Sequence, residues 1–494
     1  MRLAAAVYAV VLALTWVPAT AADLPPDVLR ALRATGIPPS DVSAVVRGID
    51  DAGRPLLEFN AREARNPASV MKLVTTYAAL NLLGPAYRWK TEVYADGARD
   101  GEVLEGNLVL RGHGDPKLTY EALWLLLRSV RAHGVRDMRG DVIVDRSFFA
   151  PVDAARIDDE AFRPYNVAPD ALLVNFKSLR FTFIPQPESG GVRIAVEPEL
   201  PGLQIVNGLR LADGACPEGR AFRELLQASF EPGANPRALF TGRYPASCAE
   251  HDMNVALYAP QDYLAGMIRQ LWTELGGRWE GRLREGLAPQ GAAPLLVHES
   301  PPLAEIIRDI NKFSNNVMAR QLYLTLAGEV RGPPAEGEQA YLAIQDWLAR
   351  RKIAAPELVM ENGSGLSRNE RISAASLAAL LADAWRSPLM PEFVASLPIV
   401  AIDGTMRRRL RDDPVAGHGH IKTGLLNGAR SIAGYVQARG GQRYVVVMIV
   451  NHPKAPQADG ALDALLRWTY EQPAAARAPA RATSRRPGAS PRHP

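Results

Sequence analysis

Apolar residues recur at helical spacing from residue 70 onward. Leu73, Val74 and Tyr77 follow Val70 at i+3, i+4 and i+7, and Gly84-Pro85 ends the run. This period places the four side chains on one face of a helix, because residues three and four positions apart are separated by about one turn. The pattern therefore predicts an amphipathic helix that begins shortly before residue 70.

A second pattern, near the C-terminus, is typical of strands. A run that begins near His418 reaches the hairpin signal Asn427-Gly428, and the runs 430–438 and 443–450 follow it. Residues 444–450 are continuously apolar, as expected for a central strand that is covered on both faces. We expect an antiparallel meander in this part of the chain.

Short strand-like runs separated by Gly and Pro turns fill residues 89–259, unlike the helix-rich flanks. Examples of such runs are 107–110, 141–144 and 191–196. With 494 residues, 47% of them apolar, the chain is long enough for two or three domains. We predict a catalytic unit made of residues 26–88 and 260–471, with residues 89–259 inserted as one β-rich domain or a nested pair of domains.

Residues 1–21 have the pattern of a secretory signal peptide. Arg2 precedes an apolar run from Leu3 to Val17, and the small-residue sequence Ala19-Thr20-Ala21 fits a cleavage site. The run has 15 residues, fewer than the ~20 needed to span a bilayer, and Pro18 ends it. We expect a cleaved signal peptide and a periplasmic or otherwise extracytoplasmic protein, with an uncleaved anchor as the alternative.

The tail, residues 473–494, contains five Arg and no acidic residue, and its Pro, Ala and Ser content predicts disorder. Removing these arginines and Arg2 from the formal net charge of +4 leaves −2, so the basic character belongs to the tail. This distribution does not support binding to nucleic acid. The tail is either an inert extension or a contact to anionic envelope polymers or lipid headgroups.

The two cysteines, Cys216 and Cys248, both fall in the predicted insertion. Export makes a disulfide between them the expectation, because disulfides persist in oxidising compartments, and two free buried thiols are the alternative. The eight His form no convincing metal cluster. His418 and His420 can share a strand face, but we expect them to flank a catalytic strand, and we expect no metal or cofactor.

Candidate chemistry begins at Ser69, which follows Asn66-Pro67 and precedes Lys72 by three residues. Asn and Pro favour the first positions of a helix, so Ser69 is expected in the first turn, where unpaired N–H groups and the helix dipole stabilise an oxyanion. Lys72 then lies one turn on, and a desolvated neutral amine there can accept the serine proton. The alternative is an exposed pair without function.

The scarcity of lysine favours the catalytic interpretation of Lys72. Only 8 of the 57 basic residues are lysine, so arginine is the usual cation of this chain. Arginine stays protonated in proteins, whereas lysine loses its proton when it is desolvated, as a general base must.

The motif Ser314-Asn315-Asn316 is a second candidate. Ser314 can relay a proton near Lys72, and the Asn316 amide can hold a substrate amide because it offers one acceptor and a donor group. Ser and Asn are also ordinary helix caps, so the motif alone does not establish a site.

The third candidate, Lys422-Thr423-Gly424, ends the first run of the predicted meander. Lys422 and Thr423 can bind a substrate carboxylate, and Gly424 leaves room for a ligand backbone to approach the strand. The main-chain N–H of Leu425 can complete an oxyanion hole with that of Ser69. By itself, Lys-Thr-Gly is a common turn sequence.

In this order, Ser-x-x-Lys, Ser-x-Asn and Lys-Thr-Gly resemble the signature set of penicillin-recognising serine acyltransferases. Residues 26–471 resemble the class C low-molecular-mass penicillin-binding proteins, the D-alanyl-D-alanine carboxypeptidase/endopeptidase family. Four further stretches carry this resemblance: Gly106–Pro116, Glu361–Arg368, Asp403–Thr405 and Gly434-Tyr435. The long gap between Lys72 and Ser314 also fits, since related β-lactamases have a much shorter one.

The resemblance implies an α/β transpeptidase-like domain, an antiparallel sheet flanked by helices, with nested inserted domains. It implies that Ser69 attacks the penultimate D-Ala carbonyl of peptidoglycan stem peptides, with Lys72 as base and Ser314 in proton transfer. Substrate binding would fall to Asn316, Lys422, Thr423, Gly424 and Leu425. β-Lactams would acylate Ser69.

Two departures from the family pattern concern specificity. The family often has Thr where this chain has Leu425, and Asp where it has Asn362. The backbone N–H of Leu425 survives the substitution, but the lost hydroxyl affects substrate preference. Two alternatives stay open here: a serine β-lactamase or esterase on the same scaffold, and a non-catalytic peptidoglycan-binding protein.

Overall fold

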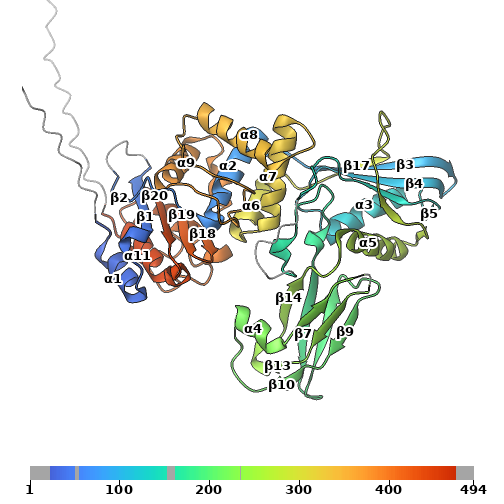
Figure 1. The fold of residues 1–494 in the computed structure, drawn as a ribbon, viewed down its shortest axis with the longest axis horizontal. Coiled ribbons are helices and arrows are strands. Elements are labelled where there is room, and N and C mark those ends of the chain that lie inside the picture. The colour runs from blue at the N-terminus through green and yellow to red at the C-terminus, as the bar shows by residue number, and fades with distance from the viewer. Residues whose placement is uncertain (1–22, 50–54, 153–161, 218, 234, 474–494) are drawn as a thin grey trace, which may run out of the picture.

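A five-stranded antiparallel sheet joins the N-terminal and C-terminal parts of the chain in the computed structural model (Figure 1). Its order is β18-β19-β20-β1-β2, from β1 (Val42–Gly48), β2 (Leu57–Phe59), β18 (Gly419–Leu426), β19 (Ala429–Gln437) and β20 (Arg443–Asn451). The structure describes residues 23–49, 55–152, 162–217, 219–233 and 235–473. The predicted signal peptide lies outside these ranges, as does the predicted tail beyond residue 473.

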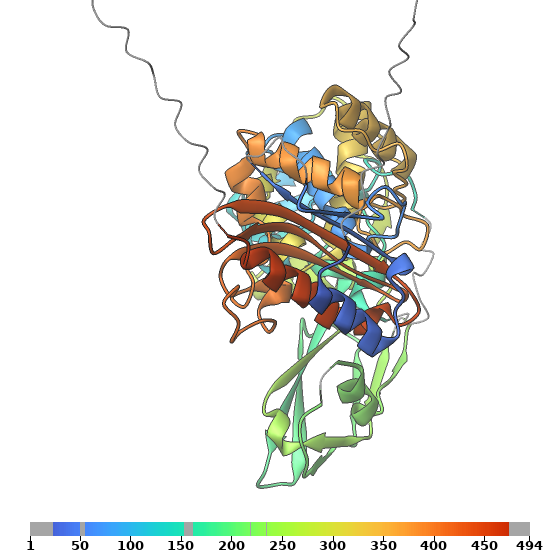
Figure 2. The same ribbon diagram turned by 90° about the vertical axis from the view of Figure 1, so that its left-hand side faces the viewer.

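The predicted meander corresponds to β18, β19 and β20, and helices cover both of its faces. Residues 445, 447 and 449 of β20 share a core with α9 (Ala374–Arg386). Residues 446, 448 and 450 share another with α1 (Pro26–Thr35) and α11 (Asp459–Tyr470), which lie side by side on the sheet in Figure 2. Alternate side chains therefore enter different cores, which explains the continuous apolar run.

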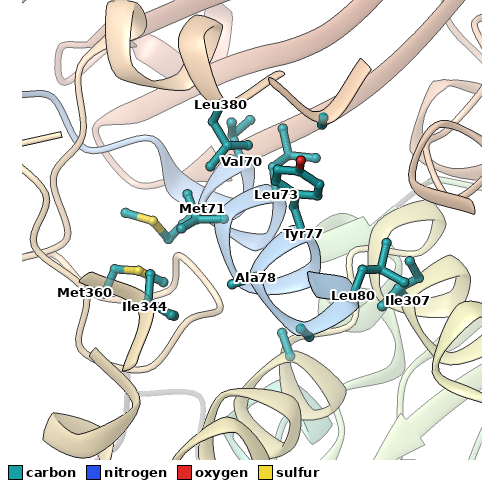
Figure 3. Close-up of a cluster of buried hydrophobic side chains, with 14 of the residues drawn as sticks. Val70, Met71, Leu73, Tyr77, Ala78, Leu80, Ile307, Ile344, Met360 and Leu380 are labelled. Atoms are coloured by element: carbon teal, nitrogen blue, oxygen red, sulfur yellow. The ribbon is translucent and has the colours of Figure 1, made fainter. Parts of the chain in front are cut away.

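The predicted helix after residue 70 is α2 (Lys72–Leu82), which follows the 3₁₀ turn η2 (Ala68–Met71). It is buried on all sides, not only along one stripe, because its polar side chains find partners. The Thr75 hydroxyl donates to Gly363 O (2.7 Å) and the Thr76 hydroxyl to Lys72 O (2.7 Å). Figure 3 shows side chains of other elements around α2. The surrounding helices are α6 (Leu303–Lys312), α7 (Asn316–Arg331), α8 (Gly337–Arg350), α9 and α10 (Met390–Ala395).

The insertion forms two lobes (Figure 1). The first has a sheet of order β15-β5-β4-β3-β17, in which β6 also pairs with β4 and β16, and helices α3 and α5 share its core. Its elements are β3 (Lys90–Asp100), β4 (Val103–Gly112), α3 (Tyr120–Ala132), β5 (Asp137–Met138), β6 (Val142–Asp145), α5 (Pro260–Glu274), β15 (Arg278–Trp279), β16 (Leu283–Glu285) and β17 (Leu296–Glu299).

The second lobe contains a five-stranded sheet of order β13-β10-β8-β7-β14 and a three-stranded sheet of order β11-β12-β9. Cys216 and Cys248 are joined by a disulfide in this lobe. Its elements are β7 (Leu179–Gln186), β8 (Gly191–Glu197), β9 (Gln204–Asn207), β10 (Arg210–Ala212), α4 (Gly219–Leu226), β11 (Ser229–Glu231), β12 (Arg237–Phe240), β13 (Arg243–Pro245) and β14 (His251–Val255).

The insertion ends later than the sequence pattern predicted. β17 pairs with β3 through Leu296 and Val93, and α5 contributes Trp272 to the same core. The chain therefore leaves the insertion and rejoins the core around α2 near residue 300, not at residue 260. The helical period of α5 does not reveal which core the helix joins. The strands β15 and β16 have only 2 and 3 residues, too few to show an alternating pattern.

Within the described ranges, no helix is both long and apolar enough to cross a bilayer.

Candidate active site

Ser69 and Lys72 lie at the buried junction of η2 and α2. Lys72 Nζ is 2.9 Å from Ser69 Oγ. The turn is fixed by Asn66, whose Oδ1 accepts from Ala68 N–H (2.9 Å) and whose backbone exchanges two hydrogen bonds with the Asn451 side chain (2.8 and 2.9 Å). The end of β20 therefore holds the segment that carries Ser69.

Two further groups hold the Lys72 amine in place. Lys72 Nζ donates to Asn316 Oδ1 (2.5 Å) and to the main-chain oxygen of Ser364. Both are acceptors only, so they take the two N–H bonds of a neutral amine, and its lone pair remains directed at the Ser69 hydroxyl. The contacts therefore orient Lys72 as a proton acceptor for Ser69.

The protonation of Lys72 is set by its burial. The side chain is fully buried, and desolvation lowers the pKa of Lys72 to about 7, against an opposing contribution from the Glu370 carboxylate. Burial in turn raises the pKa of Glu370 to about 7. A substantial fraction of Lys72 is therefore neutral near pH 7, as a general base requires.

Ser314 lies in the turn between α6 and α7, with a left-handed φ of 56°. Asn315 caps α7, its Oδ1 accepting from Met318 N–H (3.0 Å). The Ser314 hydroxyl accepts from Lys422 Nζ (2.8 Å). Its own hydrogen is therefore free to point elsewhere.

Lys422 is fully buried, with a second contact from Nζ to Thr423 O (2.7 Å). Burial, followed by the charges of Lys72 and Arg430, holds the pKa of Lys422 well below its usual value. Its amine is thus turned toward Ser314 and inward. The Thr423 hydroxyl donates to Thr405 Oγ1 (2.8 Å).

β18 is an edge strand of the sheet. Ile421 N–H points away from β19 and donates to Pro398 O (2.7 Å). The two-residue period of a strand directs Leu425 N–H to the same outer side. Strand β18 packs against η2, the turn that carries Ser69.

Gly424 packs closely against the segment that carries Ser69. A Cβ at this position would lie 2.2 Å from Ser431 Oγ and 2.6 Å from Pro67 O. The missing side chain therefore lets the protein's own η2 segment approach β18, and the Ser431 hydroxyl bonds Pro67 O there (2.5 Å). The glycine therefore allows the segment that carries Ser69 to lie on the sheet.

The loop 361–370 contributes groups whose roles the sequence did not reveal. It contains Ser364, whose carbonyl binds Lys72, and Glu370, whose Oε1 accepts from two backbone N–H groups of the loop. Gly365 has φ 78°, and a Cβ there would lie 1.9 Å from Ala68 O. The sequence signal for this loop was the resemblance of Glu361–Arg368 to the family, which does not reveal these contacts.

A buried serine and lysine one turn apart, a second Ser/Lys pair opposite and an edge strand beside them define a serine hydrolase that works through an acyl-enzyme. The transpeptidase-like domain carries this site between its sheet and its helical part. The chain belongs to the D-Ala-D-Ala carboxypeptidase 3 (S13) family, whose model matches residues 31–472. It is a serine DD-peptidase that acts on peptidoglycan.

The similarity to known proteins extends over most of the chain. A D-alanyl-D-alanine carboxypeptidase of Actinomadura sp. is 29% identical over 430 residues, covering 83% of this chain and 78% of that protein. The carboxypeptidase DacB of Haemophilus influenzae is 24% identical over 418 residues, covering 83% and 85%.

The solved structure of penicillin binding protein 4 (dacB) from Haemophilus influenzae matches the fold with a TM-score of 0.71 at 22% identity, covering 89% of this chain and 99% of that one. Its complex with a β-lactam matches with a TM-score of 0.69, at 21% identity over 90% and 99% of the two chains. The predicted α/β fold with inserted domains is confirmed.

Proposed function

We propose that Ser69 is the nucleophile and Lys72 the general base of a carboxypeptidase that removes the terminal D-Ala from D-Ala-D-Ala stem peptides. The observation that carries this assignment is the Lys72 amine, 2.9 Å from Ser69 Oγ, with its other neighbours accepting and its pKa lowered by burial. The Ser69 proton passes to Lys72 as Oγ attacks the penultimate carbonyl.

The remaining groups divide the later steps. The N–H groups of Ser69 and Leu425 stabilise the oxyanion, and the Asn316 Nδ2 group donates to a substrate amide carbonyl. Lys422 holds Ser314, whose hydroxyl gives its proton to the departing D-Ala amine and takes in its place the proton that Lys72 received from Ser69, while Thr423 binds the terminal carboxylate. Water then hydrolyses the ester on Ser69. β-Lactams acylate the same oxygen and leave slowly.

The insertion supports a second activity, cleavage of D-Ala-containing cross-links. A cleft of about 820 Å³ extends from the turn 313–317 to both inserted lobes, where Tyr120 of the first lobe and Arg180 and Glu197 of the second line it. A second stem peptide needs such a surface next to the nucleophile, whereas a single D-Ala does not. We also propose that residues 1–21 export the protein, because peptidoglycan lies outside the cytoplasm.

Product analysis tests this function. Incubation with purified peptidoglycan and with a D-Ala-D-Ala pentapeptide should release D-Ala and reduce cross-linked muropeptides. Rapid turnover of nitrocefin with little trapped acyl-enzyme would instead favour a β-lactamase. Absence of both acylation and hydrolysis would leave a binding protein.

The acylation rate should depend on pH with a midpoint near the Lys72 value. Because the base must be neutral, the rate should rise through pH 7, the pKa to which burial brings Lys72, and level off above it. Below the midpoint it should fall about tenfold per pH unit. Stopped-flow acylation by a fluorescent penicillin between pH 5 and 9 measures this profile.

The variant Glu370→Gln provides the matched control for the pH profile. Removing the carboxylate that favours the charged amine should move the midpoint to lower pH. A rate that is still rising at pH 9, or a midpoint that moves upward in Glu370→Gln, would contradict the assignment of Lys72.

A further inference from the structure

Thr405 contacts Thr423, the residue proposed to bind the substrate carboxylate. It belongs to the short turn η6 (Gly404–Met406), and its side chain is exposed, whereas Met406 beside it is fully buried. The hydroxyl oxygens of Thr405 and Thr423 are 2.8 Å apart. Two hydroxyls from separate segments thus meet at the position proposed for the substrate carboxylate.

The contact between Thr405 and Thr423 matters because the side chain of Leu425, which is next along the same strand face, is apolar. Leu425 lies two residues beyond Thr423 on β18, so both side chains project from the same face of the strand. Leu425 is 54% exposed and carries no hydrogen-bond donor. A carboxylate offers about four lone-pair sites, and this strand supplies only the Thr423 hydroxyl from its side chains.

The turn that carries Thr405 is held by an ion pair between the buried Lys312 and the partly exposed Asp403. Lys312 Nζ, at the end of α6, contacts Asp403 Oδ2 (2.5 Å) and donates to Leu397 O (2.9 Å). Asp403 Oδ1 accepts from Ile399 N–H (2.7 Å). The position of Thr405 is therefore fixed before any substrate binds.

Close backbone packing adds to this constraint. Gly404 has φ 54°, and a Cβ there would lie 2.5 Å from Lys312 O, so the turn rests directly on the end of α6. Lys312 precedes Ser314 by two residues. The ion pair between Lys312 and Asp403 thus links the turn that carries Ser314 to the turn that carries Thr405.

We propose that Thr405 is a further substrate-binding residue, which donates its hydroxyl hydrogen to the terminal carboxylate beside Thr423 and replaces the donor that Leu425 lacks. The inference rests on the proposed role of Thr423. When the carboxylate binds, the Thr423 hydroxyl turns from Thr405 to the substrate, and each hydroxyl bonds one carboxylate oxygen. Lys312 and Asp403 act as positioning residues for this contact.

The test compares two peptides that differ at one group: a peptide ending in D-Ala-D-Ala and the same peptide with its terminal carboxylate amidated. Thr405→Val should raise KM for the acid about tenfold, the usual effect of losing one hydrogen bond to a charged group. Hydrolysis of the amide should not change. Thr405→Ser should behave as the wild type, and adding Leu425→Thr to Thr405→Val should restore KM.

An unchanged KM for the acid in Thr405→Val, or equal losses on acid and amide, would overturn the proposal. Thr405→Ala removes the same hydroxyl without a branched side chain and repeats the comparison if Thr405→Val fails to fold. Penicillin labelling of Ser69 is measured in parallel. Failure of labelling in the wild type would refute the proposed function, whereas normal labelling with an unchanged KM in Thr405→Val would refute this inference alone.

Discussion

Replacing Ser69 by alanine is expected to abolish covalent labelling by penicillin and to reduce hydrolysis of a D-Ala-D-Ala peptide by about 10⁴-fold or more. Ser69 Oγ is the hydroxyl that the Lys72 amine faces at 2.9 Å. The substitution removes the oxygen that forms the acyl-enzyme and leaves the backbone N–H groups of the oxyanion hole unchanged. Fluorescent-penicillin gels and release of D-Ala measure the two effects.

A matched serine substitution controls for non-specific labelling. Ser40 is exposed and bonds only the neighbouring Asp41 through its side chain in the described structure. Ser40→Ala should therefore retain full labelling and activity. Undiminished labelling of folded Ser69→Ala protein would place the nucleophile elsewhere.

Replacing Lys72 by arginine is expected to slow acylation by about 10³-fold or more, within the range attributed to general-base catalysis. Arginine keeps the positive charge but cannot release its proton, so it cannot accept the proton of Ser69. The site is also fully buried, with Asn316 and Ser364 in contact with the amine. The acylation rate constant, measured beside the thermal unfolding midpoint, separates lost catalysis from lost folding.

Lys90→Arg makes the same change at an exposed lysine and should leave acylation unchanged. High pH should not restore the activity of Lys72→Arg, because the guanidinium stays protonated. Acylation within tenfold of the wild type in Lys72→Arg would show that Lys72 acts as a charge and not as a base.

The parts of the fold that follow a local period were predictable from the sequence. The stripe from Val70 to Tyr77 gave the helix after Ser69, and the run 444–450 gave the central strand. The motifs at Ser69, Ser314 and Lys422 indicated one site, because their residue types serve the same reaction. These predictions needed only contacts along a helix or strand, or the joint chemistry of three motifs.

The contacts made by irregular segments were not predictable in the same way. Ser364 acts through a main-chain oxygen, which no side-chain pattern reports. Thr405 and Asp403 acquire their places from a buried lysine about 90 residues earlier, Lys312. The contact between Gly424 and Pro67, which joins β18 to the segment before Ser69, was likewise not visible in the sequence. Each of these depends on which segments meet in three dimensions.

Mass mapping of the wild-type acyl-enzyme tests the central claim most directly. After reaction with penicillin and digestion with trypsin, Ser69 should lie in the peptide Asn66–Lys72, where it is the single hydroxyl residue. The account predicts that this peptide gains the mass of one penicillin molecule. An adduct on another peptide, such as the one that contains Ser314, with Asn66–Lys72 unmodified, would contradict it.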